Sequence, residues 1–198
     1  MPETESSFIL FDYTVLSIFA AVLAMDLLGS LYNGRAFINR TIWDEFKIAM
    51  DNDWQDPRLS FSYRTIFQAV SRALEVGWLQ FFDPNVNPDD EIVELRHAFG
   101  YQKRFGRSRA ESLVICSNRN WTFACDDDAA RCFARRKEIR FTSSIGILGK
   151  ATKLQILNEY EADRIHALMI NAGYCSPLPY ENGISSFFLQ PVQNRSEA

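Results

Sequence analysis

The stretch Cys125-Asp126-Asp127-Asp128-Ala129-Ala130-Arg131 marks the point where an apolar, β-prone run ends and a helix begins. Residues 121–124 precede it, and the helical sequence after it ends in Arg135-Arg136-Lys137. In a parallel α/β sheet such a junction lies at the carboxyl edge of a strand, where ligands usually bind. Three carboxylates there repel one another unless a cation or hydrogen-bond donors compensate. The question is whether other acids meet these three at the same edge.

Short apolar runs alternate with helical patterns along the rest of the chain. The predicted strands cover residues 8–11, 36–38, 78–82, 121–125 and 139–141. Helical periodicity covers residues 14–31 (as one or two helices), 42–50, 63–76, 91–99, 109–117, 127–137, 146–157 and 161–172. Gly29, Asn33 and Gly34 are expected to act as breakers of the first helical stretch, Thr41 to cap the next helix and Gly77 to end the one after it. This alternation indicates an α/β fold with a largely parallel sheet.

The composition is that of one globular domain. Of the 198 residues, 47% are apolar and 14% aromatic, which is enough for a full core. We expect residues 1–176 to form the domain and residues 177–198 to form a C-terminal tail. The formal charge of −4 argues against a generally basic nucleic-acid coat protein. A local basic patch would still allow nucleic-acid binding.

The cysteines, the histidines and the first apolar segment limit which classes of protein and of site remain possible. The four cysteines form no C-x-x-C pair, which favours reduced, mostly buried thiols in a cytoplasmic protein over a disulfide pair. His97 and His166 lie far apart in the sequence and leave little room for a histidine-rich metal site. Residues 8–32 are apolar, but Asp12 and Asp26 interrupt them and no Lys or Arg precedes them. We therefore expect protein core there, not a membrane span or a secretory signal.

Each candidate acid also has an ordinary structural explanation. Asp12 directly follows a predicted strand, where it fits either an N-cap or a metal ligand. Glu45 borders the apolar face of its helix, which is unusual for a Glu without a partner. Glu111 fits a functional acid and an exposed acid in a first helical turn equally well. Asp127 and Asp128, with the basic residues at the other end of their helix, complement the helix macrodipole. No single position decides between the two explanations.

Taken together, the acids and their surroundings resemble the PIN-domain nuclease family over roughly residues 8–176. The most specific match is residues 123–134, which look like the family's strand, paired aspartates, Ala-Arg and helix. Asp12-Tyr13-Thr14-Val15-Leu16 is similar to the opening Asp-x-Ser/Thr/Asn-x-Leu motif, and residues 41–45 to the early-helix Glu. Residues 106–111 resemble the glycine-led stretch before the third acid, with Ala110 where a Gly is usual. Residues 139–151 resemble the strand and Gly-x-Leu helix entry of one bacterial and archaeal subgroup.

The resemblance implies a three-layer α/β/α sandwich with a mainly parallel central sheet. It also implies a Mg²⁺- or Mn²⁺-dependent endoribonuclease that hydrolyses RNA phosphodiester bonds, because carboxylates are hard ligands suited to these ions. The acids it assigns to catalysis are Asp12, Glu45, Glu111 and Asp126; those it assigns to the metal are Asp12, Glu111, Asp126 and Asp127, with Thr14 in support. Asp44 competes with Glu45, and Asp128 is expected to be a first-turn helix acid.

Basic residues near two of the acids are candidate phosphate contacts. The predicted nucleic-acid-binding residues are Arg104, Arg107, Arg109 and Arg131, with Lys103, Arg135 and Arg136 nearby. The alternative for most of them is a solvated helix face. The partner implied by the resemblance is RNA, with an antitoxin protein and a second copy of the chain as further candidates and no membrane. The competing functions are a non-catalytic binding module that retains the PIN fold and a small-molecule phosphatase.

Overall fold

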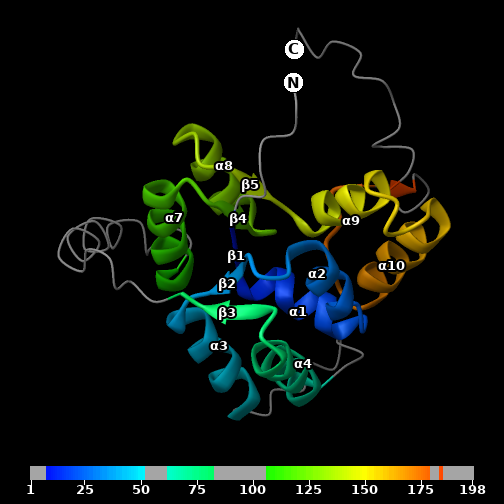
Figure 1. Ribbon diagram of the computed structural model, residues 1–198, viewed down its shortest axis with the longest axis horizontal. Helices are drawn as coiled ribbons and strands as arrows, with labels where there is room; N and C mark the ends of the chain where they lie inside the picture. The colour runs from blue at the N-terminus through cyan, green and yellow to red at the C-terminus, as the bar shows by residue number, and fades with distance from the viewer. Residues whose placement is uncertain (1–7, 52–61, 83–105, 179–182, 185–198) are drawn as a thin grey trace, which may run out of the picture.

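A five-stranded sheet forms the centre of the molecule in the computed structural model, which describes residues 8–51, 62–82, 106–178 and 183–184 (Figure 1). The strands are β1 (Ile9–Phe11), β2 (Ala36–Ile38), β3 (Leu79–Phe81), β4 (Thr122–Ala124) and β5 (Phe141–Thr142). Their order is β3-β2-β1-β4-β5, and every neighbouring pair is parallel. The predicted parallel sheet is therefore confirmed.

Helices cover both faces of this sheet, so the three-layer α/β/α prediction is also confirmed. The described residues contain α1 (Tyr13–Ala21), α2 (Met25–Tyr32), α3 (Arg40–Asp51), α4 (Tyr63–Val76), α7 (Arg107–Arg119), α8 (Asp128–Arg136), α9 (Ser144–Lys153) and α10 (Glu159–Asn171). In Figure 1, α7 and α8 lie on one side of the strands, and α1, α2, α9 and α10 lie on the other. The predicted helix at residues 91–99 falls outside the described residues.

The central position of β1 in the sheet explains why its sequence is a continuous apolar run. Successive side chains of a strand point to opposite faces of the sheet. Ile9 and Phe11 pack into one core cluster, and Leu10 packs into the other, on the side of α7 and α8. All three side chains are buried, which is the pattern expected for an interior strand of a parallel sheet.

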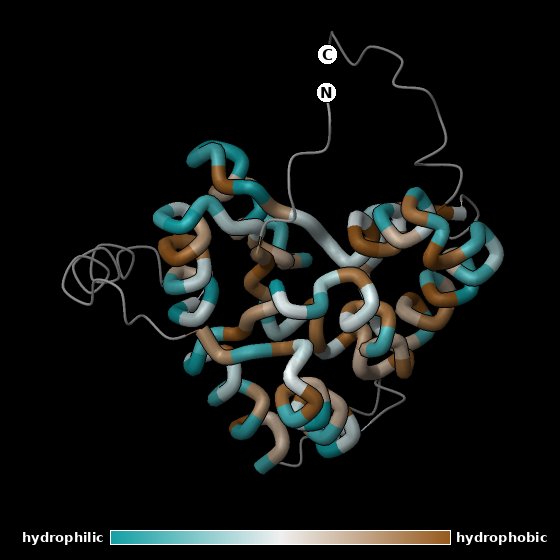
Figure 2. Tube along the Cα trace, viewed as in Figure 1, coloured by the Kyte–Doolittle hydropathy of each residue, from teal (hydrophilic) through white to brown (hydrophobic). Residues whose placement is uncertain are grey.

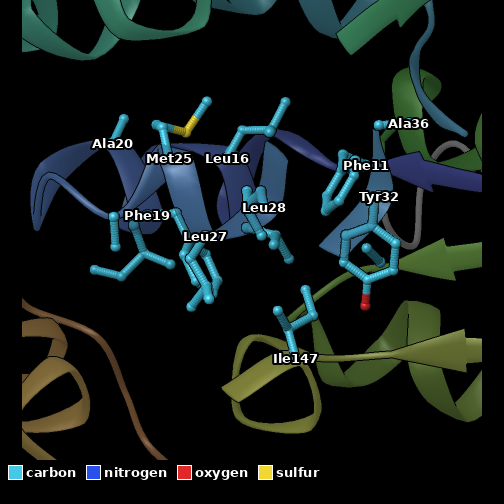
Figure 3. Close-up of a cluster of buried hydrophobic side chains, with 14 of the residues drawn as sticks. Phe11, Leu16, Phe19, Ala20, Met25, Leu27, Leu28, Tyr32, Ala36 and Ile147 are labelled. Atoms are coloured by element: carbon cyan, nitrogen blue, oxygen red, sulfur yellow. The ribbon is translucent and has the colours of Figure 1, made fainter. Parts of the chain in front are cut away.

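The larger core cluster joins helices from distant parts of the chain. Figure 3 shows Phe11 of β1 beside Tyr32 of α2, and the same cluster includes Phe19 of α1, Leu28 of α2 and Ile147 of α9. Figure 2 shows apolar residues along the strands at the centre, with hydrophilic stretches at the outer turns of α7 and α8. The first apolar segment of the sequence therefore belongs to the core. None of the helices in the described part of the chain is long and apolar enough to cross a bilayer.

Three local expectations about helix ends have different outcomes. Gly77 ends α4 in the left-handed region (φ 87°), as predicted. Thr41 does not cap α3, because the helix begins at Arg40 and the Asn39 side chain accepts the Ile42 N–H at 2.7 Å. Asn33 and Gly34 (φ 73°) follow the end of α2, as predicted, but Gly29 does not break the first helical stretch. It lies inside α2 against the Trp78 ring, and the chain turns instead at residues 22–24.

The four cysteines are unpaired, but only two are buried. Cys116 and Cys125 are buried, whereas Cys132 and Cys175 are exposed. The expectation that most of these thiols are buried is therefore only half right.

His166 on α10 gives a pH-dependent prediction for the fold. The side chain is buried and its Nε2 lies 2.7 Å from Ser176 Oγ. Burial lowers the pKa of His166 from the usual 6.5, although the nearby Asp163 opposes the change. The unfolded chain then binds the proton more tightly than the folded one. The free energy of unfolding should therefore fall as the pH drops below about 6.5.

A His166→Gln variant separates this effect from the titration of the carboxylates. Glutamine keeps a polar side chain near Ser176 but does not titrate. Denaturant unfolding between pH 5 and 8 should show that the difference in stability between wild type and variant changes across this range. Parallel pH profiles would show that His166 does not contribute.

Candidate active site

Asp12 lies at the carboxyl end of the central strand. Its N–H donates to the Ala124 carbonyl at 2.8 Å, which fixes it beside the end of β4. Its Oδ2 caps α1 by accepting from Thr14 N–H (3.4 Å) and Thr14 Oγ1 (2.7 Å). The side chain is fully buried, and among the described residues no donor reaches Oδ1. An unpartnered buried carboxylate oxygen is costly, so this atom is where a cation would be favoured.

Arg109 of α7 brings a positive charge to this carboxylate. Its Nε lies 3.1 Å from Asp12 Oδ2, and its Nη1 lies 3.8 Å from Asp127 Oδ2. Burial alone would lower the pKa of Arg109, but the charges around it, Asp12 foremost, raise it overall. One guanidinium therefore faces the acids that follow two neighbouring strands.

Asp126 is oriented by donors from two later segments. It accepts from Ser144 N–H (2.8 Å) and Ser144 Oγ (2.6 Å) at the start of α9, and from the Tyr174 hydroxyl (3.2 Å). Burial raises the pKa of Asp126, and these hydrogen bonds act in the opposite direction. Burial, with the neighbouring Asp126, also raises the pKa of Tyr174, so its hydroxyl stays protonated and donates.

The other two acids of the opening stretch have different environments. Asp127 caps α8 by accepting the Ala130 N–H at 2.8 Å, and its second oxygen faces Arg109. Asp128 is the first residue of α8, its side chain is 89% exposed, and it pairs with Arg131. Asp128 is thus a first-turn helix acid, as predicted.

Glu45 and Glu111 lie between α3 and α7. Ser108 Oγ donates to Glu45, and Thr41 Oγ1 donates to Glu111, which also pairs with Arg107 at 2.7 Å. These two contacts are about one helical turn apart along both helices. Burial raises the pKa of Glu45, the hydrogen bond from Ser108 opposes this rise, and the charge of Asp12 adds to it. Ser108 directly precedes Arg109, which pairs with Asp12. Glu111 is held one turn farther along α7.

Asp44 has no comparable contacts with the candidate acids. Its side chain is 60% exposed and pairs with Lys47 on the same helix at 3.0 Å. Glu45 therefore faces α7 and the aspartates, and Asp44 faces solvent.

A cavity of about 370 Å³ opens beside Asp126 and Asp127. Its lining also includes Arg109, Thr14 and three tyrosines, Tyr13, Tyr63 and Tyr174. A cavity lined by apolar and aromatic side chains with a few polar groups is typical of a ligand site.

The donor chemistry of this edge fits a hard divalent cation in an open site. Within residues 8–51, 62–82, 106–178 and 183–184, no cluster of three or more His, Cys, Asp or Glu is arranged to hold a metal. Mg²⁺ usually uses only one or two carboxylates, and waters and substrate phosphates complete its shell. The buried Asp12 Oδ1 and the neighbouring aspartate oxygens match this requirement.

A family model described as a PIN domain matches residues 8–187, most of the chain. The chain belongs to the PIN-domain family. PIN domains are generally nucleases, so nucleic acid is the partner class that the family implies. A comparison with curated proteins found no match. The family match extends past residue 176, and in this PIN domain Leu178 and Ile184 pack into the larger core cluster.

Most of the arginines expected to contact phosphates form ion pairs with acids of the PIN domain itself. Arg107 pairs with Glu111, Arg109 with Asp12, and Arg131 with Asp128. Arg104 and Lys103 lie outside the described residues. A nucleic-acid-binding role for these side chains stays a prediction.

Several contacts of the PIN-domain acids could not be read from the sequence. The position of Ser144 was predictable in principle, because it lies two residues after β5 and therefore at the same sheet edge as Asp126. The positions of Tyr174 and Ser108 were not, since they depend on how α10 and α7 pack. The pairing of Arg109 with Asp12 joins residues that are 97 positions apart, so no local pattern indicates it.

Proposed function

We propose that this PIN domain is a metal-dependent endoribonuclease that hydrolyses phosphodiester bonds in RNA. The observation that carries the proposal is the buried Asp12 carboxylate, whose Oδ1 has no donor among the described residues and which lies beside the Asp126 end of β4. Asp12, Asp126, Asp127 and Glu111 are the residues that would hold Mg²⁺ or Mn²⁺. The bound ion supplies activation of water and neutralisation of phosphate charge.

The protein's own contribution is to orient the acids before RNA arrives. Thr14 fixes Asp12, and Ser144 with Tyr174 fixes Asp126, so neither carboxylate has to be ordered during the reaction. Glu45 is the candidate proton acceptor, because a raised pKa brings a carboxylate closer to the neutral range in which a general base works well. Ser108 holds Glu45 in place.

Arg109 has a second use in this proposal. Its guanidinium offsets the negative charge around Asp12 and Asp127 that would otherwise repel the RNA backbone. Arginine also forms bidentate contacts with phosphate. Arg109 is therefore suited to contact the phosphate once the acids have another cation.

The direct test is cleavage of a labelled single-stranded RNA with Mg²⁺, with Mn²⁺ and with EDTA. We expect cleavage with either ion and none above background with EDTA, since no ion is then present to activate water. Contaminating ribonuclease is measured with an Asp12→Asn variant purified in parallel. Equal cleavage with EDTA and with Mg²⁺, after subtraction of that control, would show that the proposed chemistry is wrong.

A non-catalytic binding module is the second candidate, and one observation favours it. Arg109 already neutralises Asp12 and Asp127, so the acids have a partner without metal. RNA binding without cleavage in Mg²⁺ and in Mn²⁺ would support this function. For the active enzyme, we propose the toxin of a toxin–antitoxin pair as the biological setting, with the antitoxin as the partner that holds it inactive.

A further inference from the structure

Three tyrosine side chains face the same cavity as the acids. Tyr13 is the first residue of α1, Tyr63 is the first residue of α4, and Tyr174 follows α10. Each is partly buried, so part of each ring is accessible. Ile66 adds an apolar surface to the lining, and Arg109, Asp126 and Asp127 form the polar part. The lining of the cavity therefore combines aromatic rings with charged side chains.

Two of the three rings are held in position by the protein. The Tyr13 ring packs on Phe46 with 4.4 Å between ring centroids. The Tyr174 hydroxyl donates to Asp126 at 3.2 Å, which ties one aromatic wall to a candidate catalytic acid. Tyr63 begins a helix whose N-terminus is capped by Ser62. A ligand that enters this cavity meets surfaces that are already ordered.

We propose that the cavity receives one unpaired nucleotide, with its base among the tyrosines and its phosphate beside the charged side chains. The proposal rests on the proposed function for the identity of the polymer, and it adds where in the structure the base of one nucleotide is bound. A volume of about 370 Å³ is near the lower end of the range for small-molecule sites, roughly 300–1,000 Å³, which suits one nucleotide and not a base pair.

The chemistry of the lining explains the selection of an unpaired base. Every base has a flat π-face, and stacking on an aromatic side chain contributes about 1–3 kcal/mol per base. In a duplex these faces are stacked on neighbouring bases, and the edges that side chains could read lie in a groove that is hard to enter. A duplex must therefore unstack a nucleotide to use the cavity, whereas a single strand need not.

Binding measurements in EDTA test the proposal without cleavage of the strand. The probe is a fluorescent eight-nucleotide RNA, either alone or annealed to its complement. The single strand should bind more tightly than the duplex. Tyr63→Ala should raise the Kd of the single strand about 5- to 100-fold, and Tyr63→Phe, which keeps the ring, should stay within about twofold of wild type. Equal affinity for single strand and duplex, or an unchanged Kd for Tyr63→Ala, would overturn it.

Cysteine alkylation offers a test on the unmodified protein. Cys175 is exposed and lines the cavity, whereas Cys132 is exposed on α8 and does not line it. The single-stranded RNA, or adenosine monophosphate as a minimal probe, should slow iodoacetamide modification of Cys175 and leave that of Cys132 unchanged. Peptide mass spectrometry measures both rates in one sample. Unchanged rates at both cysteines, or equal slowing at both, would contradict the proposal.

These outcomes separate the cavity from the catalytic function. Protection of Cys175 in a chain that never cleaves RNA would support the nucleotide site and contradict the proposed ribonuclease activity. Metal-dependent cleavage without protection of Cys175 would support the proposed ribonuclease activity and contradict the nucleotide site.

Discussion

An Asp12→Asn variant is expected to lose RNA cleavage by about 10³-fold or more, which corresponds to about 4 kcal/mol of transition-state stabilisation. Asparagine has nearly the same shape and can still cap α1 through its side-chain oxygen. It lacks the negative charge, however, and Asp12 is the fully buried acid at the end of the central strand. Initial rates with a labelled RNA at saturating Mg²⁺ measure the effect.

Asp128→Asn is the matched control for this prediction. Asp128 belongs to the same acidic stretch, but its side chain is exposed and pairs with Arg131. We expect it to cleave RNA at close to the wild-type rate. Near-equal losses in both variants would show that general negative charge matters and that Asp12 has no special role.

The second large effect is expected from Arg109→Ala in the absence of divalent ions. Removing one partner of a buried ion pair leaves the other charge uncompensated, at a cost of about 3–5 kcal/mol when both are fully buried. Because Arg109 is 23% exposed, we expect about 2–4 kcal/mol. A divalent ion that binds at Asp12 should restore stability to the variant by RT ln(1 + c/Kd), where c is the concentration of the free ion. Thermal unfolding with EDTA and with a series of Mg²⁺ concentrations measures both effects.

Arg107→Ala is the control on the same helix. Its ion pair with Glu111 is formed by an exposed arginine, and exposed pairs contribute only about 0–1 kcal/mol. The Arg107 variant should therefore unfold close to the wild type, and Mg²⁺ should raise its melting temperature less than that of Arg109→Ala. If Mg²⁺ stabilises the two variants equally, Arg109 does not compete with the metal.

The architecture was predictable because its signals are local. Residues 8–11 are a continuous apolar run, which is what an interior parallel strand requires, and Gly77 occupies the left-handed position that ends α4. The start of α3 was predicted wrongly because Asn39 and Thr41 are both good capping residues. Only the backbone path shows that Asn39 caps the helix.

The candidate site was less predictable because its contacts are long-range. The choice of Glu45 over Asp44 depends on which face of α3 meets α7, a question of packing that periodicity only partly answers. The partners of Asp126 come from 18 and 48 residues later in the chain. The roles of these acids in catalysis and metal binding remain predictions that the variants above would test.

The pairing of β1 with β4 determines when during biosynthesis the candidate site of this domain can assemble. Asp12 contacts Cys125, which is 113 residues away, and Asp126 follows directly. A nascent chain that has emerged only as far as α7 already carries Asp12, Glu45 and Glu111, but it has neither the neighbouring strand nor its aspartates. Contacts at such separation form late and slowly. A ribonuclease assembled in this way would remain inactive on the ribosome until most of its chain had been translated.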